Sequence, residues 1–92
     1  MILNFKCPDT QALFEGQRVP RFVNIQSVAL RKLAILNRVS QVDELRIPPG
    51  NRLEMLKGDR REHYSIRIND QWRVCFAFEN GHALNVEIID YH

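Results

Sequence analysis

The amino-acid sequence predicts an α+β fold in which an N-terminal strand and two helices pack on a mainly antiparallel sheet. Apolar residues in the first half recur at helical spacing, whereas from Arg52 onward they alternate with polar residues, as in half-buried strands. The helical segments also precede the strands, without the strand–helix alternation that builds a parallel sheet. The 92 residues contain no repeat, low-complexity stretch or linker, so we expect a single domain over residues 1–92.

The N-terminal half is expected to begin with a short strand over residues 2–5. A first helix should begin at Pro8 and end at Gly16. A second helix should follow Asn24, whose side chain we expect to cap it. Its core-facing residues are Ile25, Val28, Ala29, Leu33 and Leu36. The turn residues Pro48-Pro49-Gly50-Asn51 indicate that the stretch over 39–51 is a loop.

Three strands sharing one apolar face are expected in the second half of the chain. Their inward residues are Tyr64, Ile66 and Ile68, then Trp72, Val74, Phe76 and Phe78, and finally Leu84, Val86 and Ile88. A three-residue connection over 69–71 keeps the first two strands facing the same way, whereas a two-residue connection would mix their faces. The same argument predicts a three-residue connection over 80–82, which pairs Phe78 with Leu84.

This register pairs Arg67 directly with Arg73. Both side chains then lie on the face of the sheet opposite the apolar face. Because like charges across a strand pair are unfavourable, we expect both guanidinium groups to be presented to a bound anion. Arg73 then faces Ile89, and Tyr91 lies on the diagonal from Arg73. This side of the sheet is therefore the best candidate for a site.

Basic residues cluster in the same region. Six of the 13 Lys and Arg residues fall between residues 52 and 73, and none follows Arg73. We expect these six to bind RNA: Arg52, Lys57, Arg60, Arg61, Arg67 and Arg73. The alternative is a solvated face, which is the commoner role of a charge-rich stretch.

Several classes of function are excluded by missing motifs. The chain has no glycine-rich phosphate loop, no Cys/His spacing typical of a metal site and no nucleophile elbow. Its two cysteines give no disulfide framework, and no apolar run approaches the roughly 20 residues of a membrane span. We therefore expect a cytoplasmic protein with no metal, no cofactor and no membrane partner.

Cleavage of RNA without a metal remains open to such a chain. A 2′-hydroxyl can attack its adjacent phosphate if one group removes its proton, another protonates the leaving oxygen and cations stabilise the transition state. The candidate acids and bases are Glu54, Asp90 and His92, the candidate cations are Lys57, Arg67 and Arg73, and Tyr91 could stack a base or donate a proton. Trp72 and Cys75 are interpreted as structural residues.

Five segments together resemble the HigB toxins of the RelE/ParE superfamily, also labelled plasmid-maintenance killer proteins. They are Pro48-Pro49-Gly50-Asn51-Arg52-Leu53-Glu54, Leu56-Lys57-Gly58-Asp59-Arg60, Tyr64-Ser65-Ile66-Arg67-Ile68-Asn69, Gln71-Trp72-Arg73 and Asp90-Tyr91-His92. The resemblance covers essentially the whole chain. It implies a toxin that cleaves mRNA in the ribosomal A site and is neutralised by a HigA-type helix-turn-helix antitoxin, through which alone it would meet operator DNA.

The same resemblance implies a catalytic set. Its members here are Lys57, Arg67, Arg73, Asp90, Tyr91 and His92. Some homologues carry a histidine where this chain has Glu54, so either Glu54 or His92 could act as the base. Two alternatives remain: a ParE-like topoisomerase inhibitor that cleaves nothing, and a degenerate module that binds antitoxin with weak toxicity.

Overall fold

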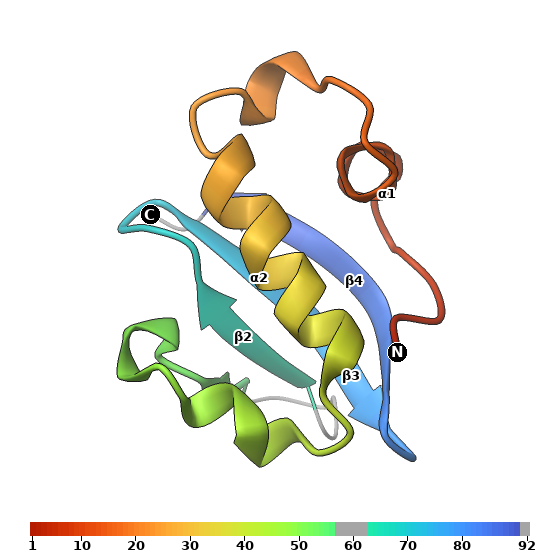
Figure 1. Ribbon diagram of the computed structural model, residues 1–92, viewed down its shortest axis with the longest axis vertical. Coiled ribbons are helices and arrows are strands. Elements are labelled where there is room, and N and C mark those ends of the chain that lie inside the picture. The colour runs from red at the N-terminus through yellow and green to blue at the C-terminus, as the bar shows by residue number, and fades with distance from the viewer. Residues whose placement is uncertain (57–62, 91–92) are drawn as a thin grey trace.

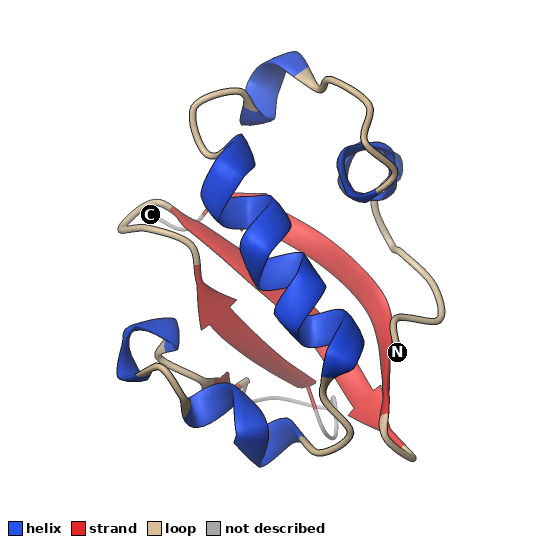
Figure 2. Cartoon of the chain, viewed as in Figure 1, coloured by secondary structure: helices blue, strands red, loops and turns tan. Residues whose placement is uncertain are grey.

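A computed structural model describes residues 1–56 and 63–90 (Figure 1). Among these residues, four antiparallel strands form one sheet in the order β1-β2-β3-β4. The elements are α1 (Pro8–Phe14), η1 (Pro20–Phe22), α2 (Gln26–Arg38), η2 (Val42–Arg46), η3 (Pro49–Asn51), β1 (Glu54–Met55), β2 (His63–Arg67), β3 (Trp72–Glu79) and β4 (His82–Asp90). Figure 2 shows α2 crossing one face of the sheet, which confirms the predicted α+β fold.

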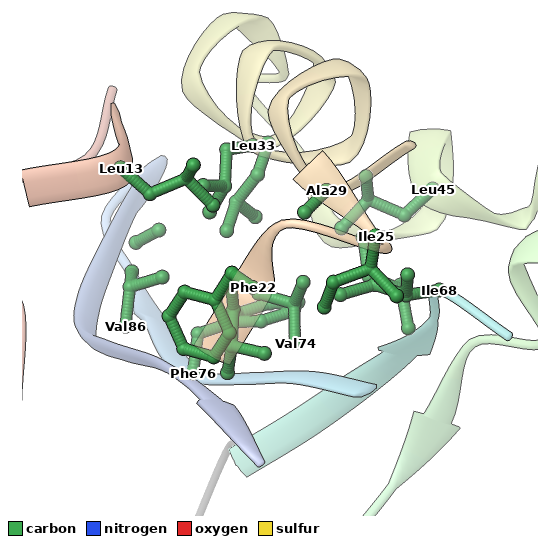
Figure 3. Packing of buried hydrophobic residues seen from close by; sticks show 14 of the residues in the cluster. Leu13, Phe22, Ile25, Ala29, Leu33, Leu45, Ile68, Val74, Phe76 and Val86 are labelled. Atoms are coloured by element: carbon green, nitrogen blue, oxygen red, sulfur yellow. The ribbon is translucent and has the colours of Figure 1, made fainter. Parts of the chain in front are cut away.

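The core lies between α2 and the sheet. Ala29, Leu33 and Leu36 of α2 are fully buried, as predicted. Figure 3 shows Ala29 and Leu33 above the sheet residues Val74 and Phe76. Burial of this apolar surface is the main stabilising contribution to the fold. None of the helices in the described part of the chain crosses the opposite face of the sheet (Figure 2). No helix within residues 1–56 and 63–90 is long and apolar enough to cross a membrane.

The N-terminal segment does not form the expected strand. Ile2 and Phe5 make isolated parallel bridges to Ala83 and Val86 of β4. Between these bridges, Asn85 has a left-handed backbone (φ 54°), so β4 is not extended there and a continuous ladder cannot form. The Asn4 and Asn85 side chains bond across the gap, with Nδ2 of Asn4 2.8 Å from Oδ1 of Asn85.

The first helix begins at Pro8, and Gly16 follows it with the left-handed φ (91°) that ends many helices. The prediction that Asn24 caps the second helix is wrong. The N-cap is Ile25, which makes no side-chain capping bond and is buried in the core. The stretch over 39–51, expected as a loop, contains the short helices η2 and η3.

The predicted register between β2 and β3 is confirmed. Ile66 pairs with Val74, and Arg67 lies directly opposite Arg73. The far end of the next hairpin is also as expected, because Arg73 pairs with Ile89.

The turn of the β3–β4 hairpin differs from the prediction. It has two residues, Asn80 and Gly81, whose φ values of 52° and 80° are typical of a type I′ turn. Phe78 consequently pairs with Ala83, and not with Leu84. A bulge at Asn85 inserts one residue and restores the predicted pairing beyond it.

Candidate active site

The sheet face opposite α2, here called the open face, carries the polar residues of the strands. Strand pairing places one row of side chains across all four strands and a second row beside it. The rows are Glu54–Ser65–Cys75–Glu87 and Arg67–Arg73–Ile89. Three predicted site residues, Glu54, Arg67 and Arg73, therefore share this face.

Arg73 is held from three directions. Its Nε donates to Oγ of Ser65 at 2.9 Å, its Nη2 donates to the carbonyl oxygen of Arg52 at 2.7 Å, and its Nη1 lies 2.8 Å from Oε1 of Glu54. Arg73 is only 9% exposed and Ser65 only 1%. The guanidinium is therefore a fixed and largely buried positive charge on the open face, and Glu54 is its acidic neighbour.

The carbonyl of Arg52 reaches Arg73 because of the turn that precedes β1. Arg52 adopts a left-handed backbone (φ 46°, ψ 58°) directly after the fully buried Asn51. The Asn51 Nδ2 donates to the carbonyl oxygens of Leu45 at 3.1 Å and Ile47 at 3.4 Å. These bonds fix the turn and, through it, the carbonyl that holds Arg73.

Lys32 of α2 completes this support by donating from Nζ to Oδ1 of Asn51. Burial lowers the pKa of Lys32, and the nearby charges of Arg31 and Arg67 lower it further. The helix on one face of the sheet is thus connected to the site on the other through a buried amide.

Arg67 also has an acidic partner of its own. Its Nη2 forms an ion pair with Oδ1 of Asp70, and this pairing lowers the pKa of the Asp70 carboxyl. From the sequence we expected both guanidinium groups to be presented to a bound anion. In the structure each of them already has a carboxylate partner. Arg67 pairs with Asp70 and Arg73 with Glu54, and these carboxylates offset the repulsion between the two arginines.

Asp90 lies elsewhere. It pairs with Trp72 across the β3–β4 ladder, so its side chain leaves the sheet on the opposite side from Arg73. Its Oδ2 accepts a hydrogen bond from Nε2 of Gln71 at 3.1 Å. The structure does not bring Asp90 onto the open face. Five other predicted site residues, Lys57, Arg60, Arg61, Tyr91 and His92, lie outside the described residues.

The two residues interpreted as structural are confirmed in that role. Trp72 packs edge-to-face on Phe22 with ring centroids 5.6 Å apart. Burial raises the pKa of the Cys75 thiol to about 11, with a further contribution from the charge of Glu87, so Cys75 is a poor nucleophile. Over residues 1–56 and 63–90, no three His, Cys, Asp or Glu side chains are grouped so that they could hold a metal ion.

Ser65, Asn51 and Lys32 were not predicted as site residues. Ser65 was detectable in principle, because its outward parity places it on the same face as Arg73. Asn51 and Lys32 gave no such signal, since one stood in a turn-like run and the other on the polar side of a helix.

Comparison with known proteins gives a consistent result. The model of a family described as the RelE-like toxin of the type II toxin–antitoxin system HigB matches residues 11–92. A protein of Vibrio cholerae named Toxin HigB-1 is 39% identical over 87 residues, covering 92% of each chain. A protein of Proteus vulgaris named Endoribonuclease HigB is 35% identical over the full length of both chains.

Proposed function

The chain belongs to the HigB-like toxins, the RelE-like toxins of type II toxin–antitoxin systems, and on this premise we propose that it is a ribosome-dependent endoribonuclease. The observation that carries the proposal is the fixed guanidinium of Arg73 on the open face, with the Glu54 carboxylate beside it. A cation held in place before the substrate arrives stabilises the charge that develops on a phosphate during cleavage, at no cost of reorganisation.

In the proposed reaction, the 2′-hydroxyl oxygen of one nucleotide bonds to its adjacent phosphorus. The bond from phosphorus to the 5′-oxygen of the next nucleotide breaks, which leaves a 2′,3′-cyclic phosphate and a 5′-hydroxyl. The 2′-hydroxyl proton passes to a base, and an acid supplies a proton to the departing oxygen. Neither a metal nor a cofactor is required, because protein cations neutralise the phosphate.

The described residues support two of these roles. Arg73 contacts the phosphate, and Arg67 adds a second positive charge one strand away. Glu54 is 59% exposed at its side chain and touches Arg73, so a phosphate bound by Arg73 lies next to a carboxylate that can accept the 2′-proton. We assign proton donation to His92, with Lys57 and Tyr91 assisting, and RNA binding to Arg52, Arg60 and Arg61. Asp90 takes no part in this proposal, because its side chain lies on the other side of the sheet.

The proposed partners are translating ribosomes with their mRNA in the cytoplasm and a HigA-type helix-turn-helix antitoxin. Antitoxin binding would silence the toxin and link it to operator DNA.

The test is incubation of the purified chain with translating ribosomes, followed by primer extension to map new 5′ ends. We expect cleavage by the native chain, strong loss in Glu54→Gln, and no loss in Glu79→Gln, a matched control at an exposed residue at the end of β3. Absence of new 5′ ends would refute endonuclease activity. Equal cleavage of free mRNA would refute dependence on the ribosome. Inhibition of a topoisomerase without cleavage would favour the ParE-like alternative.

A further inference from the structure

A cavity of about 350 Å³ lies on the open face beside the proposed active site. Its lining combines apolar and polar side chains. The residues that matter for its chemistry are Leu56 and Ile89, which are apolar, and Lys6, Asn85 and Glu87, which are polar. The proposed mechanism uses none of these five residues.

The position of the cavity relative to Arg73 is fixed by the strand register. Ile89 pairs directly with Arg73, so this wall lies one strand spacing away, about 4.8 Å. Cys75, two residues along β3, also lines the cavity. Cys75 pairs with Ser65, whose hydroxyl accepts from Arg73, so the cavity begins beside a residue that holds the guanidinium and extends along β3 away from Arg67. A nucleotide whose phosphate contacts Arg73 has its neighbouring base within reach of this space.

The polar wall offers a hydrogen-bond donor beside an acceptor. Nζ of Lys6 lies 3.5 Å from Oε2 of Glu87, and the Glu87 side chain is 21% exposed. Such a pair complements a nucleobase edge on which an acceptor and a donor are adjacent, as with O6 and N1–H of guanine or N1 and the amino group of adenine. Ile89 and Leu56 provide apolar surface for the face of the base.

The cavity is also lined by Asn85, which lies at the bulge in β4. Asn85 has a left-handed backbone, and its Oδ1 accepts from Asn4, which ties the wall to the N-terminal segment. Bulges of this kind re-aim side chains next to functional sites. The cavity is therefore bounded by a structural feature that a plain four-stranded sheet would not have.

We propose that this cavity binds a purine base next to the scissile phosphate and that Lys6 and Glu87 determine the base preference of cleavage. The inference rests on the proposed function and adds a specificity site to it. A purine is favoured over a pyrimidine because the cavity accommodates a two-ring base and its apolar walls gain contact area from the second ring.

Binding can be tested separately from cleavage. The labelled 92-residue chain is titrated with AMP, GMP, CMP and UMP, and backbone amide shifts are followed by NMR. We expect AMP or GMP to shift the amides of residues 85–89 and Lys6, and CMP and UMP to bind more weakly. Glu87→Gln and Lys6→Met should each weaken purine binding roughly fivefold, as for the loss of one hydrogen bond, whereas Glu79→Gln should not.

The second measurement maps 5′ ends after ribosomal cleavage by the same variants. Glu87→Gln should relax the purine preference at one position next to the cut while cleavage continues. Purine binding without any cleavage would refute the proposed function and support this cavity as a base site. Cleavage with unchanged preference and no purine-dependent shifts would overturn the inference and leave the nuclease intact. Shifts at the cavity caused only by the antitoxin would also overturn it, in favour of a protein partner.

Discussion

Replacing Arg73 by alanine should destabilise the fold, even though the change removes one of two opposed positive charges. Arg73→Ala removes the hydrogen bonds that Arg73 donates to Oγ of Ser65 and to the carbonyl oxygen of Arg52, and Ser65 is only 1% exposed in the native protein. A hydrogen bond to a charged group contributes about 1.5–3 kcal/mol. Relief of the repulsion from Arg67 returns only a few tenths of a kcal/mol.

The net effect follows from how exposed each partner is. Glu54 is 59% exposed, so its carboxylate returns to water and adds little to the loss. We therefore expect Arg73→Ala to lower the free energy of unfolding by about 2–4 kcal/mol, which for a domain of this size lowers Tm by roughly 8–30 °C. Arg67→Ala is the matched control. It should change Tm far less, because the Asp70 partner is 99% exposed.

Thermal and urea unfolding followed by circular dichroism would measure both variants. A third variant, Ser65→Ala, supplies a double-mutant cycle with Arg73→Ala, and its effect should be smaller in the Arg73→Ala background because the shared bond is already lost. Equal Tm values for native protein and Arg73→Ala, or equal losses at Arg67 and Arg73, would refute the reasoning. Additive effects of the two replacements at Ser65 and Arg73 would refute the assigned hydrogen bond.

Three further predictions concern the chemistry of the chain. Binding to single-stranded RNA should weaken with added salt by a log–log slope of roughly −0.7 per phosphate contact, and a flat response would reduce the basic stretch over 52–73 to a solvated face. Deleting His92 should abolish growth arrest while antitoxin binding persists. Equal arrest from both chains would mean that His92 is not the proton donor and would leave Glu54 as the proton-transfer group on the open face. Burial alone would raise the pKa of Cys7, but hydrogen bonds from Thr10 and Asp9 and the charge of Arg21 outweigh it and lower the pKa. The pKa of Cys75 is raised to about 11, so little of its thiol is ionised at pH 8. Iodoacetamide should therefore label Cys7 before Cys75, as followed by mass spectrometry. Labelling in the reverse order would contradict the assignment.

The register of β2 and β3 could be predicted because only one connection length keeps both apolar faces inward. The turn between β3 and β4 could not be predicted by the same rule. A two-residue Asn80-Gly81 turn reverses the parity of the residues that follow, and the bulge at Asn85 reverses it again. Two compensating reversals leave the alternation at the far end unchanged, so hydrophobic patterning alone does not reveal either of them.

The position of Arg73 on the open face was also predictable, but its partners were not. Ser65 is eight residues away along the chain and the Arg52 carbonyl is 21 residues away. The carbonyl is a backbone group, so no residue type marks it. Its direction depends on a left-handed turn that is anchored by Asn51 and, through it, by Lys32 on the helix.

The bonds that stabilise Arg73 are the same bonds that fix its guanidinium in place. In the proposed mechanism this arrangement places the transition-state cation before the substrate arrives, with its ordering entropy already lost during folding. Activity and stability should therefore be lost together in Arg73→Ala. Glu54→Gln should lose activity but keep its stability. The exposed carboxylate contributes little to folding, whereas the proposed reaction needs it as the proton acceptor. In the proposed mechanism the open face therefore combines a largely buried cation, Arg73, with an exposed base, Glu54.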